Sequence, residues 1–148
     1  MKAINETRIT FLSRSANEGF ARSAVAAFIS QLDPAVDQLS DIRVALSEAV
    51  TNCIVHAYPD SIGMITVTVR LYENGKVIIK VRDKGRGIPD IAQAMEPMYT
   101  TGGEDRSGLG FLVMETFVDK LRVRSKVGSG TTVTLEKYIH LRQADKPV

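Results

Sequence analysis

The strongest constraint on the fold is a segment in the middle of the chain where apolar and polar side chains alternate in two runs. The pair Asn74-Gly75 separates the runs, and such pairs supply the positive φ angles of a tight hairpin turn. Because successive side chains of a strand point to opposite faces, the pattern predicts an antiparallel hairpin with one buried face. Another layer must cover that face. The apolar positions are Ile65, Val67, Val69, Leu71, Val77, Ile79 and Val81.

A first helix is predicted to begin at Ser15, because Ser15 and Glu18 have the spacing of a capping box. It should end near Leu32, because the following Asp33-Pro34 step disfavours helical backbone. Five of its residues, including both phenylalanines, share one face of this helix. That face consists of Phe20, Ala24, Ala27, Phe28 and Gln31.

A second helix is predicted from about residue 37 to residue 56, where apolar side chains recur at helical spacing. Glu48 and Asn52 fall outside this apolar stripe, one turn apart, so they should face outward together. The stripe consists of Leu39, Ile42, Leu46, Ala49, Val50 and Cys53. Cys53 is interpreted as a small buried hydrophobic residue.

The remaining elements complete an α/β sandwich, a mixed sheet with helices on one side. They are a strand over 8–12, a short helix over 91–95, a helix over 109–118, strands over 121–125 and 131–138, and a frayed tail over 139–148. The chain has 148 residues, of which 44% are hydrophobic, and this size predicts one domain.

Charge and hydropathy exclude some classes of function. The net charge of +2 is too small for a nucleic-acid binder, so a protein or small-molecule partner is favoured. The N-terminus lacks the apolar core of a signal peptide, and no apolar run approaches the roughly 18 residues of a membrane span. The chain is therefore expected to stay in the cytoplasm without a membrane partner.

The first chemical motif is the pair Glu48 and Asn52 on the second helix. A carboxylate can take a proton from an attacking hydroxyl group, and a neutral amide oxygen can bind Mg²⁺ without repelling phosphates. The alternative is a solvated pair on a surface helix, and for this motif alone the alternative is favoured.

The second motif is Asp83-Lys84-Gly85-Arg86-Gly87, at the end of a predicted strand. Asp83 can accept a hydrogen bond from an exocyclic amino group, and the glycines let the backbone approach a flat ring. An Asp-rich turn is the simpler explanation when the motif is taken alone.

The third motif is Ser107-Gly108-Leu109-Gly110, directly before an apolar helix. Free backbone N–H groups at a helix start form an anion site suited to phosphate. The preceding loop, from Thr100 to Arg106, could close over the site and bring Arg106 to a γ-phosphate. A plain helix start and an exposed arginine remain the alternatives.

The fourth motif is Gly128-Ser129-Gly130-Thr131-Thr132, which enters the last strand. A hydroxyl group here could hydrogen-bond a nucleotide or a neighbouring water molecule. A glycine-rich hairpin turn explains the segment nearly as well.

The four motifs together, in this order, resemble the four boxes of the GHKL ATPases, a superfamily that includes histidine kinases. The resemblance covers about residues 37–137 and implies the Bergerat α/β sandwich of that superfamily. Within it, the chain looks most like the sporulation anti-sigma F factors. The residues that carry this closer likeness are Phe20-Ala21-Arg22, Gln31-Leu32-Asp33-Pro34, Ser47 to Asn52, Gly87 to Ile91, and Glu104 to Gly108.

The resemblance implies an activity and partners. Such proteins are homodimers that bind a sigma factor and use ATP, as serine kinases, to phosphorylate an anti-anti-sigma factor. Three alternatives stay open. They are a kinase of the anti-sigma B type, a module that sequesters a sigma factor without phosphate transfer, and an α/β domain that binds no nucleotide. A histidine-kinase catalytic domain is disfavoured, because neither His56 nor His140 lies in a helical hairpin.

The resemblance also implies roles for individual residues. Glu48 would be the general base and Asn52 the Mg²⁺ ligand, and Asp83 would accept a hydrogen bond from the adenine amino group. Arg106 would lie near the γ-phosphate, and Arg22 on the protein-binding surface. Gly85, Gly87 and Thr132 would line or support the base pocket, and Thr101, Ser107, Gly108, Leu109 and Gly110 would contact the nucleotide.

Overall fold

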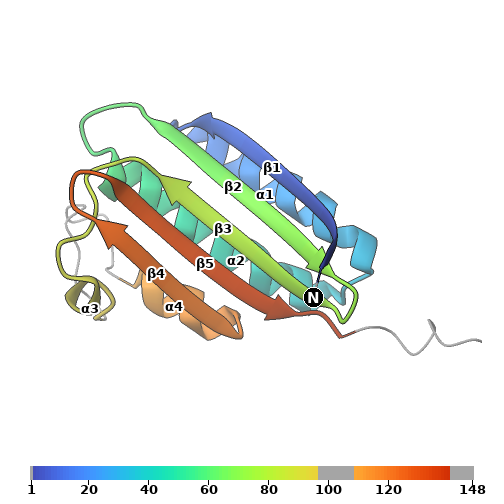
Figure 1. Ribbon diagram of the computed structural model, residues 1–148. Helices are drawn as coiled ribbons and strands as arrows, with labels where there is room; N and C mark the ends of the chain where they lie inside the picture. Colours follow the sequence, from blue (N-terminus) through green and yellow to red (C-terminus); the bar gives the residue numbers. More distant parts are fainter. Residues whose placement is uncertain (1, 97–108, 141–148) are drawn as a thin grey trace, which may run out of the picture.

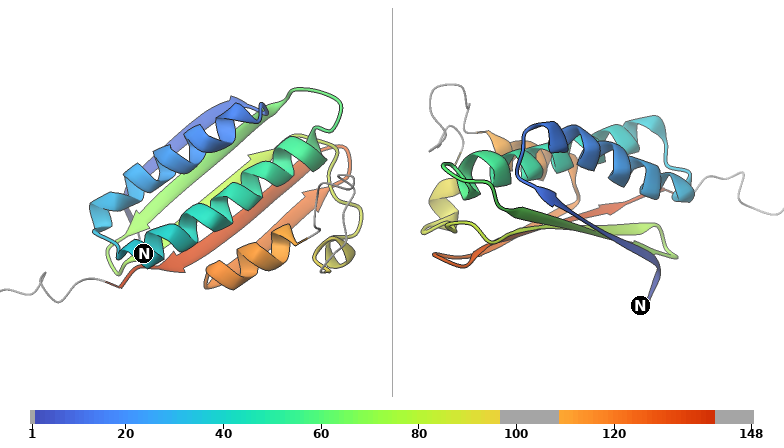
Figure 2. Two further views of the ribbon diagram at one scale, coloured as in Figure 1. Left: turned by 180° about the vertical axis from the view of Figure 1, so that it is seen from behind. Right: turned by 90° about the horizontal axis from the view of Figure 1, so that it is seen from above.

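The chain folds into two layers, a five-stranded sheet and a layer of helices that covers one face of it (Figures 1 and 2). The computed structural model describes residues 2–96 and 109–140. The strand order in the sheet is β1-β2-β3-β5-β4. The strands are β1 (Ala3–Leu12), β2 (Met64–Tyr72), β3 (Lys76–Asp83), β4 (Lys120–Lys126) and β5 (Gly130–Tyr138).

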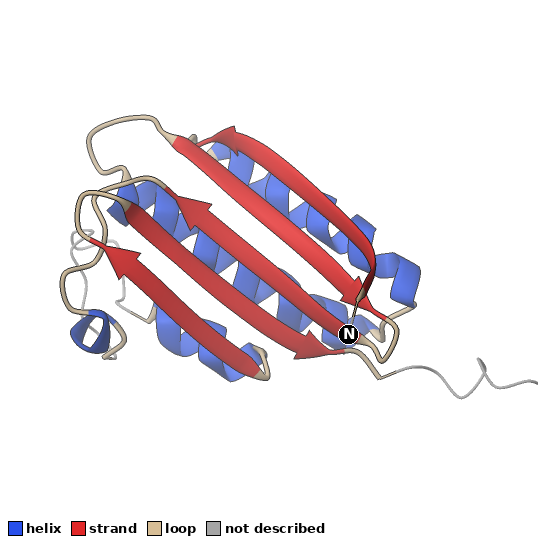
Figure 3. Ribbon diagram, viewed as in Figure 1, coloured by secondary structure: helices blue, strands red, loops and turns tan. Residues whose placement is uncertain are grey.

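The helices lie close to their predicted positions, and the α/β sandwich is confirmed (Figure 3). The second predicted helix is α-helical only to Asn52 and then widens into a π-helical turn. The helices are α1 (Ala16–Ile29), η1 (Ser30–Leu32), α2 (Val36–Asn52), η2 (Cys53–Ala57), α3 (Ile91–Ala94) and α4 (Gly110–Phe117).

The sheet is antiparallel throughout, whereas the sequence predicted a mixed sheet. Every neighbouring pair of strands runs in opposite directions. Strands β3 and β4 point the same way and are joined through α4, as in a parallel crossover. They do not pair, because β5 returns along the chain and inserts between them.

The core lies between the sheet and helices α1, α2 and α4. The alternating apolar residues of the central hairpin are buried on the helix-facing side, as predicted. From α2, the stripe that includes Ile42 and Leu46 packs against them. The opposite face of the sheet carries no helix in the described part of the chain (Figure 1).

Helix α1 begins directly after Ser15, but the capping box predicted there does not form. Ser15 has helical backbone angles and its side chain makes no cap hydrogen bond, and the Glu18 carboxylate instead accepts from Arg22 and Ser47. The buried face is displaced around the helix from the face that carries both phenylalanines. Its members are Ala21, Val25, Ala26 and Ile29, whereas Phe20 is 52% exposed and contacts Phe11 edge to face.

The tight turn predicted at Asn74-Gly75 is present between β2 and β3, and it has three residues, 73–75. The strand register runs to Leu71 opposite Val77, and the amide of Gly75 donates to the Tyr72 carbonyl. Within this turn only Gly75 has a positive φ angle, of 89°. This is the geometry of a type I turn followed by a left-handed glycine, a common alternative to the two-residue turn.

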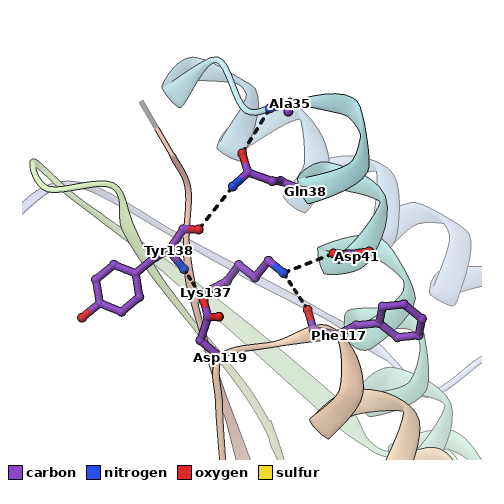
Figure 4. Close-up of polar contacts among 7 residues, drawn as sticks. All are labelled: Ala35, Gln38, Asp41, Phe117, Asp119, Lys137 and Tyr138. Atoms are coloured by element: carbon purple, nitrogen blue, oxygen red, sulfur yellow. Dashed lines mark hydrogen bonds and ion pairs between the residues drawn. The ribbon is translucent and has the colours of Figure 1, made fainter. Parts of the chain in front are cut away.

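Polar contacts fasten the C-terminal end of β5 to the helical layer (Figure 4). The Lys137 ammonium group lies 3.2 Å from a carboxylate oxygen of Asp41 on α2, and donates to the Phe117 carbonyl at the end of α4 at 3.0 Å. A cation at a helix C-terminus binds carbonyl groups that have no partner in the helix. One side chain of β5 therefore holds two helices against the sheet.

The first residue of the predicted frayed tail, Ile139, is packed into the protein. Ile139 is 2% exposed, and its amide donates to the Gly75 carbonyl, so it belongs to the core. Residues 141–148 lie outside the described residues. Within the part that is described, none of the helices combines the length and the hydropathy that a membrane crossing requires.

Candidate functional site

A cavity of about 400 Å³ opens at the end of the sheet where β3 ends. Its walls come from the C-terminal half of α2, the π-helical turn η2, the segment after β3, the start of α4 and the first residues of β5. The volume is within the usual range for small-molecule sites. Its walls are largely apolar and include Ala49, Ile88, Phe111 and Val133.

Asp83 is the buried acid of this cavity, with only 4% of its surface exposed. One carboxylate oxygen, Oδ1, accepts hydrogen bonds from the amides of Gly85 at 2.9 Å and Thr131 at 3.1 Å. Burial raises the pKa of Asp83, and these hydrogen bonds oppose the rise. The carboxylate is thus fixed in orientation at the floor of an apolar cavity.

Cys53 also contacts Asp83, and the sequence did not predict this role. Its thiol lies 3.4 Å from the Oδ2 atom of Asp83 and donates to it, within the wall of the cavity. Burial, and next the neighbouring Asp83 charge, raise the pKa of Cys53 well above its usual value. The thiol therefore stays protonated and remains a hydrogen-bond donor.

The π-helical turn shapes the same wall. In η2 the Ala57 carbonyl points out of the helix and accepts from the Arg86 amide at 3.2 Å. The Tyr58 hydroxyl accepts from the Lys84 amide and donates to the Met64 carbonyl, both at 2.7 Å. These contacts hold the segment after β3 against the end of α2. π-Helical turns are frequent at functional sites.

Two glycines of the second motif are required by backbone packing. A Cβ atom on Gly85 would lie 2.3 Å from the Ala57 carbonyl oxygen, and one on Gly87 would lie 2.4 Å from that of Lys126. Gly87 also has a φ of 81°, which disfavours side chains. The glycines thus let three backbone segments meet at the cavity, and Gly87 itself lines it.

Glu48 and Asn52 lie together, as the sequence predicted, but they do not simply face outward: both are half-buried and face the start of α4. A Cβ atom placed on Gly110 would lie 3.3 Å from Oε2 of Glu48 and 3.2 Å from Oδ1 of Asn52. Asn52 and Gly110 line the cavity, and His56, one turn further along, does so too. A carboxylate and a carboxamide therefore meet a helix start at the mouth of the cavity.

Arg22 lies on α1, away from the cavity, and is held by two neighbours. Its guanidinium group donates to Glu18 at 2.8 Å and to the Ser47 hydroxyl at 3.5 Å, and that hydroxyl also donates to Glu18. Ser47 directly precedes Glu48 on α2. The predicted protein-binding arginine and the predicted base are thus connected through adjacent residues.

One predicted site residue, Thr132, does not line the cavity. Thr132 pairs with Arg82 in the sheet, and both side chains lie on the face away from the helices. Thr131 is the residue that is buried in the cavity, and its hydroxyl exchanges a 2.7 Å hydrogen bond with Ser125. Thr131 lines the cavity in place of Thr132 because adjacent residues of a strand point to opposite faces of the sheet.

Part of the predicted site lies outside the described residues. These are Thr101, Arg106, Ser107 and Gly108, so the glycine loop and the predicted cation are not placed. Leu109 and Gly110 are placed, at the start of α4, and Leu109 precedes the helix directly.

The described residues suit an adenine nucleotide. The cavity offers apolar walls for a flat ring and a buried carboxylate as acceptor for an amino group. In residues 2–96 and 109–140, no three His, Cys, Asp or Glu side chains gather closely enough to hold a metal ion. A neutral amide such as Asn52 suits Mg²⁺ that obtains most of its ligands from phosphates and water.

Comparisons with known proteins agree with this geometry. The profile of the histidine kinase-like ATPase domain matches residues 11–137. The anti-sigma F factor of Caldanaerobacter subterraneus is 51% identical over 140 residues, which are 94% of this chain and 97% of that protein. The anti-sigma F factor of Geobacillus kaustophilus is 50% identical over 137 residues, covering 91% of this chain and 93% of that protein.

Solved structures share the fold at lower identity. The structure of the RsbU and RsbW domains of Rv1364c from Mycobacterium tuberculosis superposes with a TM-score of 0.68 at 23% identity, covering 91% of this chain and 32% of that one. A histidine kinase domain from Erythrobacter litoralis gives a TM-score of 0.56 at 23% identity, covering 88% of this chain and 66% of that one. At this identity the likeness concerns the fold alone.

Proposed function

We propose that this chain, which belongs to the anti-sigma F factor family within the histidine kinase-like ATPases, is a serine kinase that also binds a sporulation sigma factor. In this proposal it uses ATP to phosphorylate a serine of an anti-anti-sigma factor. One observation carries the proposal, namely that Glu48 and Asn52 lie side by side against Gly110 at the start of α4. This arrangement supplies a base and a metal ligand beside a potential phosphate site.

Adenine recognition is assigned to the floor of the cavity. The Asp83 carboxylate accepts a hydrogen bond from the adenine amino group, and Cys53 and the Thr131 amide hold that carboxylate in place. Apolar side chains such as Ile88 and Val133 enclose the ring. An amino group at this position is what separates adenine from guanine, which carries a carbonyl oxygen there.

Phosphate binding is assigned to the segment around the start of α4. Backbone N–H groups at a helix N-terminus attract anions, and Gly110 leaves the space between α4 and α2 free of a side chain. Asn52 would hold Mg²⁺, which when bound offsets negative charge on the phosphates. Arg106, whose position is not described, is assigned to the γ-phosphate by family likeness.

The reaction requires little covalent participation by the protein. The serine oxygen of the partner forms a bond to the γ-phosphorus, and the bond from that phosphorus to the β,γ-bridging oxygen breaks. Glu48 accepts the proton of the serine hydroxyl. The products are ADP and a phosphoserine on the partner, and Glu48 later returns its proton to solvent.

Partner binding is assigned to α1. Arg22 is 38% exposed at its side chain, and Glu18 and Ser47 fix its orientation, so it can present a directed charge to a protein surface. A homodimer is part of the proposal, and β1 offers one route to it, because among the described strands β1 is at the edge of the sheet and has a neighbour on one side only. We place the protein in the cytoplasm with its partners.

The test is phosphate transfer measured by intact mass. The purified protein is incubated with ATP, Mg²⁺ and the product of a small reading frame next to its gene, and the partner should gain one phosphate. Glu48→Gln should abolish the gain but keep ATP binding. The control Glu115→Gln, at an exposed position on α4, should transfer normally. Sigma-factor binding without any phosphate gain would leave a sequestering protein and reject the kinase.

A further inference from the structure

The face of the sheet that carries no helices has a strongly basic corner, and Figure 1 is seen from that side. On β4, alternate residues point to this face, and on β3 two more do so. All five are exposed and together form what we call the basic corner. Its members are Lys80, Arg82, Arg122, Arg124 and Lys126.

The register of the sheet places these charges in rows. Strand β5 lies between β3 and β4, so Arg82 and Arg124 flank Thr132, and Lys80 and Arg122 flank Thr134. Neighbouring cations along one strand are about 7 Å apart, because each residue rises by roughly 3.3 Å. Across two strand spacings the separation is about 10 Å. The corner is therefore a regular array of cations separated by threonines.

Among the described residues, no ion pair joins an acidic side chain to this array. The face carries Glu6 and Glu136 in the row next to Lys80 and Arg122, where they stand opposite Arg70 and Lys120. Clustered like charges destabilise a folded protein because they repel one another. A contribution to stability therefore does not explain why this corner is basic.

Protection of a sheet edge explains only part of the corner. Charged residues on an edge strand prevent unwanted pairing with other strands, and β4 is such an edge. Strand β3, however, is paired on both sides. Lys80 and Arg82 therefore protect no edge, and their presence points to a ligand for the face itself.

We propose that the basic corner docks an extended acidic segment of a partner protein. In an extended segment, alternate side chains point the same way and repeat about every 7 Å, which is the spacing of the cations along β3 and β4. Nucleic acid fits less well, because the rows contain threonines and no aromatic side chain on which bases could stack. The chain's net charge of only +2 agrees. This site is distinct from the cavity, and the proposal does not depend on kinase activity.

The test uses two peptides of identical composition and the full-length protein. One peptide alternates glutamate and threonine, and its isomer has the glutamates and the threonines sorted into two blocks. Fluorescence anisotropy at physiological salt should show several-fold tighter binding of the alternating peptide. Arg122→Glu with Arg124→Glu should weaken this binding by about tenfold, since two attractive surface pairs become repulsive. The control pair Arg14→Glu with Arg43→Glu should have little effect.

Several results would overturn the proposal. They are equal binding of the two isomers, equal effects of the two double variants, or tighter binding of a random DNA duplex or phosphatidylglycerol vesicles. Loss of self-association by the Arg122/Arg124 variant in sedimentation would also overturn it, because the corner would then contact a second copy. The neutral variant Arg122→Gln with Arg124→Gln, with circular dichroism as the folding check, should bind with intermediate affinity.

Discussion

Replacing Gly110 by alanine should separate the stability of this protein from its activity. Gly110 is the first residue of α4 and does not have a positive φ, so alanine is compatible with its backbone. Alanine is favoured over glycine in helices by up to about 1 kcal/mol, and by less at a helix end. The free energy of unfolding should therefore stay the same or rise slightly.

The same substitution should impair phosphate transfer. The new methyl group would lie 3.2 Å and 3.4 Å from the side-chain oxygen and nitrogen of Asn52, and 3.3 Å from Oε2 of Glu48. These contacts are tighter than usual, so both side chains must move by a few tenths of an ångström. Because a misplacement of about 1 Å can cost roughly 100-fold in rate, a shift of this size should cost about tenfold, or about 1.4 kcal/mol in the barrier.

Two measurements check this prediction. Urea unfolding gives the stability, and single-turnover transfer from ATP to the anti-anti-sigma partner gives the rate. Gly19→Ala is the control, since its methyl group would meet only Arg22, at an ordinary 3.8 Å. It should raise stability and leave ATP binding unchanged. Wild-type transfer by Gly110→Ala, or a loss of several kcal/mol in stability, would refute the packing described here.

Three further predictions concern the pocket and its supports. Gly87→Ala should lose more stability than Gly128→Ala in urea unfolding. Both glycines have a φ near 80°, but only a methyl group on Gly87 would meet a backbone oxygen, at 2.4 Å. Equal losses of stability in the two variants would contradict the close approach of the backbone at Gly87. Lys137→Met should cost about 1–2 kcal/mol, since the Phe117 carbonyl loses its partner, whereas Arg70→Met, which breaks the exposed pair with Glu6, should cost clearly less than Lys137→Met. Asp83 has a raised folded pKa, so between the ordinary Asp value of about 4 and that raised value the folded protein keeps a proton that the unfolded chain releases. The free energy of unfolding should consequently fall as pH rises through this window, and the fall should be smaller in Asp83→Asn; an equal or larger fall in the variant would exclude this role of Asp83.

The elements with clear periodicity were predictable from the sequence. The apolar stripe of α2 and the alternation of β2 and β3 identify buried faces without knowledge of the partner layer. The buried face of α1 was not identified because Phe20 and Phe28 dominated the pattern. Small residues such as Ala21 let α1 approach its neighbours closely, and Phe20 instead packs at the edge, on Phe11.

Features that depend on contacts between distant segments were not predictable. The insertion of β5 between β3 and β4 makes the sheet antiparallel, and no local pattern encodes that order. The hydrogen bond from Cys53 to Asp83 likewise joins a helix to a strand 30 residues away. The exchange of Thr132 for Thr131 was within reach, because Thr131 has the same parity as the buried Val133 and Leu135.

The central claim is that the cavity at the end of β3 binds an adenine nucleotide through Asp83. Isothermal titration of the purified protein with ATP and Mg²⁺ tests it most directly. We expect one site per chain and a preference for ATP over GTP, with Asp83→Ala losing most of the affinity while Asp60→Ala, at an exposed position that does not line the cavity, keeps it. Absence of binding, or equal binding of ATP by the wild-type protein and Asp83→Ala, would contradict the account.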